Sequence, residues 1–175
     1  LLDAVVATGT PTAVVLVQGR PHVLPDTAPA LLTAWYPGPW GGEAIAEALL
    51  GLAEPAGRLP VSVPRSAAQL PVYYNHKDTE YGGYVDESAE PRYSFGHGLS
   101  YTSFAYGMPR LSGGTVTVDV TNTGRRYGRS VVQVYLRRLI APTWPRTLEL
   151  CAFAALGYAG ARLFVIRDTR KEHPM

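Results

Sequence analysis

Residues 91–104, which read PRYSFGHGLSYTSF, carry the strongest fold signal in this chain. Four aromatic residues are interspersed there with two glycines, one histidine and small hydroxyl residues. Because the glycines lack a Cβ, the backbone can turn sharply or lie close to another segment. The aromatic rings offer large apolar faces for packing. We therefore expect a seam between two structural units, with Phe95, Tyr101 and Phe104 largely buried.

Other short motifs flank this stretch on both sides. They are VQGRP at 17–21, AWYPG at 34–38, AIAEALLG at 44–51, PAGRLP at 55–60, LPVYYNHK at 70–77, VTNTG at 120–124 and VQVYL at 132–136. In this order, together with FGHGLSYTSF, they resemble the C-terminal sandwich domain of family 3 glycoside hydrolases and the fibronectin-type-III-like module that follows it. That family contains β-glucosidases and β-xylosidases. The resemblance covers nearly the whole chain and does not indicate which sugar is bound.

The composition indicates a globular chain and excludes several classes of partner. A content of 46% hydrophobic and 17% charged residues is not that of a disordered protein. The formal net charge is only +2 and the basic residues are dispersed, so we expect no nucleic-acid partner. No apolar run is long enough to span a bilayer, so we expect no membrane association. Cys151 is the sole cysteine, which rules out a disulfide within the chain.

The first half of the sequence predicts alternating helices and strands. Leu1–Ala7 has a helical pattern, and the apolar run Ala13–Val17 is typical of a strand covered on both faces. Leu31–Trp35 is a second candidate strand, and Glu43–Leu50 is a second candidate helix whose first-turn glutamate suits the helix dipole. This order is typical of an α/β layer domain.

The pattern changes near Phe104 to short alternating strands, predicted at 115–120, 130–136, 148–153 and 162–166. We therefore predict an α/β sandwich fragment over residues 1–104, followed by an all-β immunoglobulin-like, fibronectin-type-III-like sandwich over residues 105–175. The second domain is shorter than the roughly 100 residues of a typical sandwich of this kind. The first residue already lies within a helical pattern. We therefore expect both domains to be incomplete at the chain ends, and the cellular compartment stays open.

The resemblance also implies where the catalytic groups lie. A retaining glycosidase needs two carboxyl groups about 5–5.5 Å apart. In the family, the nucleophile is an aspartate of an N-terminal barrel, and the acid/base carboxyl, where this domain provides it, precedes the segment that matches Leu1. We therefore expect no catalytic residue in this chain and a barrel domain of the same polypeptide as its partner. Glu43 and Glu47 share a helix face and are best explained as solvated charges.

Sugar-contacting residues are sought in the loop YYNHK at 73–77 and near the AWYPG turn. Tyr74 and His76 combine an aromatic face with an imidazole, and Trp40 is a further candidate for the substrate-binding side. The alternative is that this loop only packs against the barrel. The four histidines lack metal-ligand spacing, and no phosphate-binding glycine loop is present, so neither a metal nor a cofactor is predicted.

The predicted function is the C-terminal part of a retaining, exo-acting β-glycosidase that hydrolyses terminal β-linked glucose or xylose. The chain would serve as scaffold and, if Tyr74 and His76 face the sugar, as one wall of the pocket. On its own it is expected to be inactive. Two alternatives remain open: a non-catalytic carbohydrate-binding or adhesion module, and a decayed reading frame, which the polar tail at 168–174 keeps under consideration. Glucose or xylose preference, linkage and oligomeric state are not determined by these residues.

Overall fold

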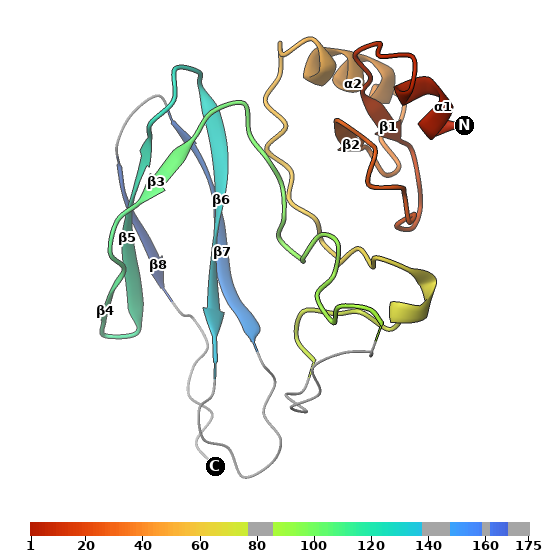
Figure 1. Ribbon diagram of the computed structural model, residues 1–175. Coiled ribbons are helices and arrows are strands. Elements are labelled where there is room, and N and C mark those ends of the chain that lie inside the picture. The colour runs from red at the N-terminus through yellow and green to blue at the C-terminus, as the bar shows by residue number, and fades with distance from the viewer. Residues whose placement is uncertain (77–85, 138–147, 159–161, 168–175) are drawn as a thin grey trace. The chain divides into compact units, whose positions relative to one another are not determined.

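The computed structural model describes residues 1–76, 86–137, 148–158 and 162–167. The chain divides into two compact units, which we describe separately. The described part of unit 1 comprises residues 1–53, 61–72 and 86–94. Unit 2 comprises residues 54–60, 73–76 and all described residues from 95 onward. Most of the regular structure is β-strand (Figure 1).

The described part of unit 1 contains two helices, two short strands and one 3-10 turn. They are α1 (Leu2–Val6), β1 (Val14–Leu16), β2 (Leu31–Thr33), α2 (Gly41–Leu49) and η1 (Ala67–Gln69). β1 and β2 are parallel, with Val14 opposite Leu31 (Figure 1). Each of these helices and strands overlaps a range predicted from the sequence, and each strand is shorter than predicted. All residues of both strands are only half-buried, so the expected burial of the first strand on both faces is not seen in unit 1.

α2 begins two residues earlier than predicted because Gly41 lets the chain pack tightly at its first turn. A Cβ at Gly41 would lie 2.5 Å from the ring of Pro37. Glu43 occupies the first turn, where a negative charge is favourable, and Ala48 is buried. The helix is followed by Gly51 at φ +72°, a conformation that glycine adopts without strain.

The regular structure in the described part of unit 2 is all β-strand. Its strands are β3 (Phe104–Tyr106), β4 (Arg110–Ser112), β5 (Thr115–Asn122), β6 (Gly128–Leu136), β7 (Glu149–Tyr158) and β8 (Arg162–Arg167). β5 pairs antiparallel with β3, β4 and β8, and β6 pairs antiparallel with β7 (Figure 1). The four strands predicted from alternation are present. β3 and β4 were missed because each is only three residues long.

The core of unit 2 is formed by alternate residues of its longer strands. Val118, Val120, Val132 and Leu156 are buried, and Val120 is completely inaccessible. Phe104 packs against this cluster and is half-buried. The alternation of apolar and polar residues that predicted these strands thus also identifies their inward face.

The stretch 95–104 lies wholly in unit 2, where it is held against residues 54–60. The Leu59 N–H donates to the His97 carbonyl, and the Gly96 N–H donates to the Leu59 carbonyl, both at 2.8 Å. A Cβ on Gly98 would lie 2.5 Å from the Gly57 carbonyl oxygen, so the predicted close backbone approach at the glycines is confirmed.

The aromatic residues of this stretch are not all buried as expected. Phe95 and Phe104 are half-buried within unit 2. The expectation for Tyr101 is wrong, because its side chain is 42% exposed. The Arg126 guanidinium lies 5.3 Å from the centre of its ring, which is a cation–π contact at the surface. The boundary expected at Phe104 stays a prediction, although residues 54–60 and 73–76 group with the later strands.

Candidate functional site

The predicted sugar-contacting loop, residues 73–76, is fastened to unit 2 through Tyr74. Its ring stacks on Phe95 with centroids 4.2 Å apart and planes at 18°. The Tyr74 ring also meets the Tyr135 ring of β6 edge to face, with centroids 6.0 Å apart and planes at 73°. Its hydroxyl accepts a hydrogen bond from the Leu150 N–H of β7 at 3.4 Å. Tyr74 is therefore held by three separate segments, and its ring and hydroxyl are engaged in packing within unit 2.

A second layer of contacts supports these rings. Gly96 has φ +81°, and a Cβ there would clash with the side-chain amide of Gln133. The Tyr135 hydroxyl donates to Oε1 of the same Gln133 at 2.9 Å. Burial raises the pKa of the Tyr135 hydroxyl above its ordinary value of 10.0, and the charge of an ionised Tyr74 would raise it further.

Tyr73 and His76 are exposed and lie on either side of Tyr74 in the sequence. The Tyr73 side chain is 52% exposed, and His76 is exposed as well. Their rings meet edge to face, with centroids 6.4 Å apart and planes at 68°. Tyr74 and His76 were predicted contacts, and Tyr73 was not. Tyr74 and Asn75 lie in a turn, so strand alternation gives no signal here, and the sequence offers none that separates Tyr73 from Tyr74.

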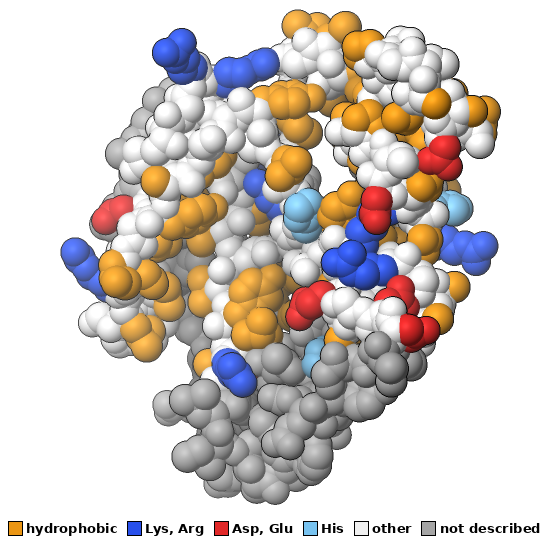
Figure 2. Space-filling view, in the orientation of Figure 1, with side chains coloured by type: hydrophobic (Ala, Val, Ile, Leu, Met, Phe, Trp, Pro, Cys, Tyr) orange, Lys and Arg blue, Asp and Glu red, His pale blue; other side chains and the backbone are white. Residues whose placement is uncertain are grey.

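Trp40, the third predicted contact, lies in unit 1 immediately before α2. Trp40 is 76% exposed, and Tyr36, four residues earlier, is 83% exposed. Trp35, at the end of β2, has φ +51°, an uncommon conformation for a residue other than glycine. Large apolar side chains are exposed in both units, and Figure 2 shows many of them in orange on one face. Trp40 and the loop 73–76 belong to different units and are therefore not combined into one site.

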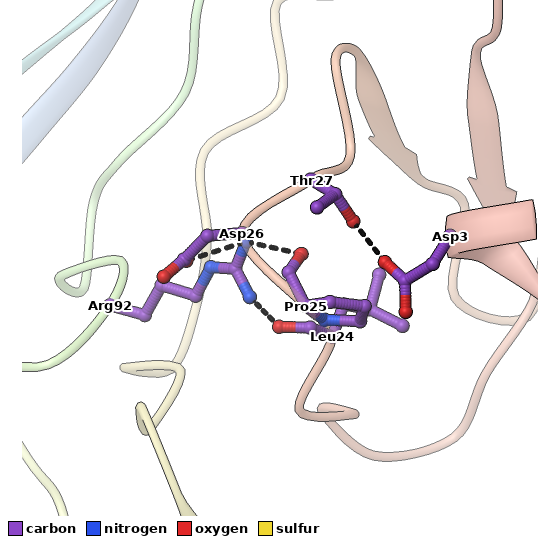
Figure 3. Close-up of polar contacts among 6 residues, drawn as sticks. All are labelled: Asp3, Leu24, Pro25, Asp26, Thr27 and Arg92. Carbon is purple, nitrogen blue, oxygen red and sulfur yellow. Dashed lines mark hydrogen bonds and ion pairs between the residues drawn. The ribbon is translucent and has the colours of Figure 1, made fainter. Parts of the chain in front are cut away.

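Unit 1 has its own polar cluster, centred on Arg92 (Figure 3). Its guanidinium donates to the carbonyls of Leu24 and Pro25, and it lies 3.1 Å from the Asp26 carboxylate. The Arg92 side chain is only 11% exposed, whereas that of Asp26 is 90% exposed. The Thr27 hydroxyl donates to Asp3 at 2.6 Å, which connects the same loop to α1 (Figure 3). Arg92 thus fixes an irregular loop that follows β1.

Several carboxylates are engaged in holding the chain together. Glu54 accepts hydrogen bonds from the Ser100 hydroxyl and, at 3.3 Å, from the Tyr101 N–H. Glu87 accepts from the Ser66 hydroxyl at 2.8 Å. Within the described ranges, no group of three or more His, Cys, Asp or Glu side chains could hold a metal ion. None of the described helices is long and apolar enough to cross a membrane.

Comparisons with known proteins connect this architecture to one family. The model of the glycosyl hydrolase family 3 C-terminal domain matches residues 1–101. The periplasmic β-glucosidase of Salmonella typhimurium is 42% identical over 163 residues, covering 81% of this chain and 21% of that protein. A β-xylosidase of Formosa agariphila is 39% identical over 152 residues, covering 78% of this chain and 21% of that protein.

Solved structures agree with these relatives. A β-glucosidase from Erythrobacter marinus matches with a TM-score of 0.88 and 40% identity, covering 96% of this chain and 24% of that one. The chain spans about a fifth of the length of the curated relatives named above. The family model covers more than half of the chain, and it includes most of the glycine- and aromatic-rich stretch that begins at Pro91. The chain therefore belongs to glycosyl hydrolase family 3.

Proposed function

We propose that this chain is the C-terminal part of a retaining, exo-acting β-glycosidase that removes terminal β-linked glucose or xylose. The observation that carries the proposal is the family match over residues 1–101, together with relatives named β-glucosidase and β-xylosidase. In this proposal, residues 1–104 are part of the α/β sandwich domain and residues 105–175 are the fibronectin-type-III-like domain. A barrel domain of the same polypeptide is the structural partner.

The catalytic carboxyl groups are supplied by the remainder of the enzyme. Double displacement requires a nucleophile and an acid/base group on opposite sides of the same glycosidic bond. Glu54 and Glu87 each accept hydrogen bonds from groups of their own unit. A carboxylate that stabilises its own fold in this way is a poor candidate for attack on a sugar carbon. The role left for this chain is to support the barrel and to contribute contacts to the substrate.

The candidate substrate contacts are Tyr74, His76 and Trp40. Binding sites for small molecules combine apolar and aromatic walls with a few polar groups, placed on loops that a rigid scaffold supports. The exposure of Trp40 and His76 supports a contact role for these two residues. Tyr74 contributes by placing its loop, since its own ring and hydroxyl are already engaged.

The proposal is tested by grafting. The matching C-terminal segment of the Salmonella typhimurium β-glucosidase is replaced by this chain, and hydrolysis of aryl β-glucosides and β-xylosides is measured. The control is the same enzyme with that segment deleted. We expect the graft to be active, and both the deletion control and the purified chain alone to remain at background. A soluble, folded graft without activity would refute the proposal, as would turnover by the isolated chain that persists through purification.

A further inference from the structure

We propose that Tyr73, paired with His76, contacts the sugar and that Tyr74 acts as the positioning residue that holds this pair in place. The inference rests on the proposed function and names the contact residues of unit 2. It differs from the prediction made from the sequence, in which Tyr74 itself was the contact. Tyr73 has not otherwise been assigned a role.

Tyr74 is fixed within unit 2. Its ring stacks on Phe95 at 4.2 Å and meets Tyr135 edge-on at 6.0 Å. The segment that carries Phe95 is itself held by two 2.8 Å backbone hydrogen bonds to Leu59. The Tyr74 hydroxyl is tied to the backbone of β7 at Leu150. A residue with this many partners cannot turn to a ligand without breaking them.

With Tyr74 fixed in this way, its neighbours Tyr73 and His76 are exposed. Tyr73 keeps 52% of its surface accessible, although it adjoins a residue that is packed on strands β6 and β7. The Tyr73 and His76 rings meet edge to face, with centroids 6.4 Å apart and planes at 68°. This edge-to-face arrangement is one that aromatic pairs prefer, and it gives the two exposed rings a defined relative orientation.

The chemical groups of Tyr73 and His76 match those of a sugar ring. A pyranose presents C–H groups on its faces and hydroxyl groups at its rim. The exposed Tyr73 ring offers an apolar surface and its hydroxyl can donate or accept a hydrogen bond, while the His76 imidazole is a polar neighbour beside it. Holding them on an anchored loop lowers the entropy lost on binding, which is how a modest set of contacts yields useful affinity. This combination suits a β-linked sugar ring better than an anion or a metal ion.

The experiment uses the active graft described above and compares four variants with the unsubstituted graft on cellobiose and xylobiose. For Tyr73→Ala we expect the KM for at least one disaccharide to rise roughly three- to tenfold, the range expected for losing one aromatic contact. We expect kcat and the melting temperature to stay unchanged, which indicates loss of binding and not of catalysis. Tyr127→Ala is the matched control, because its side chain is 60% exposed elsewhere in unit 2.

Tyr74 is tested by the other two variants. Tyr74→Leu removes the stacked ring, and we expect it to lower the melting temperature and to raise KM as Tyr73→Ala does. Tyr74→Phe keeps the ring and removes only the hydroxyl, and we expect it to restore KM. Tyr74→Phe with a KM as high as that of Tyr74→Leu would overturn the positioning role.

Failure of the inference and failure of the proposed function give different results. An active graft whose KM is unchanged by Tyr73→Ala, or changed equally by Tyr127→Ala, overturns the inference and leaves the function in place. An inactive graft refutes the function, and the contact is then decided by saturation-transfer NMR of cellobiose and xylobiose with the chain itself. Transfer that disappears in Tyr73→Ala and persists in Tyr127→Ala supports the contact, whereas any other pattern, including no transfer, overturns it.

Discussion

Phe95→Ala tests whether the stretch 95–104 stabilises unit 2 through aromatic packing. Replacing a fully buried phenylalanine by alanine costs about 3–5 kcal/mol. Phe95 is half-buried, so we expect about half of that loss, or roughly 2 kcal/mol, of which its stacking on Tyr74 supplies about 0.5–1.5 kcal/mol. For a unit of this size, such a loss lowers the melting temperature by about 10 °C.

The assay is thermal and urea unfolding of the chain, followed by circular dichroism. Leu99→Ala is the matched control, since it lies in the same stretch with a side chain that is 77% exposed. We expect the control to change the free energy of unfolding by less than about 0.5 kcal/mol. A double-mutant cycle with Tyr74→Leu should give a coupling of about 1 kcal/mol between the two rings. The reasoning is refuted if Phe95→Ala destabilises no more than Leu99→Ala, or if the two rings show no coupling.

Three further substitutions test other parts of the structure. Val120 lies at the inaccessible centre of the unit 2 core, and Val120→Ala should lower the free energy of unfolding in urea by about 2 kcal/mol. The control, Leu111→Ala, replaces a residue that is 76% exposed and should leave that free energy almost unchanged. Equal losses would contradict the assigned core. Burial raises the pKa of Tyr135 above 10.0, so the folded chain favours its neutral form. The contribution of Tyr135 to the free energy of unfolding should therefore be constant below pH 10.0 and fall above it. Tyr135→Phe should reduce that fall. Arg92→Ala should lower the free energy of unfolding by about 1–3 kcal/mol, because it leaves carbonyl groups of the loop after β1 without their donor. Asp26→Asn should lower it by less than about 0.5 kcal/mol, because the Asp26 side chain is 90% exposed. Equal losses would contradict the role given to Arg92.

Much of the secondary structure could be predicted from local pattern. The alternation in β5 and β6 and the apolar spacing of α2 each predict an element that the structure contains. β3 and β4 could not be predicted in this way, because three residues are too few to establish a period. Their existence depends on pairing with β5, and each of them lies along a different part of that strand.

The aromatic stretch shows the same division at the level of single residues. Its glycines predict close backbone approach wherever the segment packs, since a missing Cβ has the same effect in any partner arrangement. Whether a particular ring is buried depends on what lies next to it. Phe104 adjoins the core of unit 2, whereas Tyr101, which carries a polar hydroxyl, lies at the surface beside Arg126.

By itself, the sequence determined the family, the helices and longer strands, and the segment 73–77 in which sugar contacts were sought. These follow from residue types and their spacing, which are properties of the chain alone. Only the tertiary structure decided that Tyr74 is packed within unit 2 and that the adjacent Tyr73 is exposed. The two side chains are chemically identical, and their difference arises from Phe95, Tyr135 and Leu150, which the fold brings to one of them and not to the other.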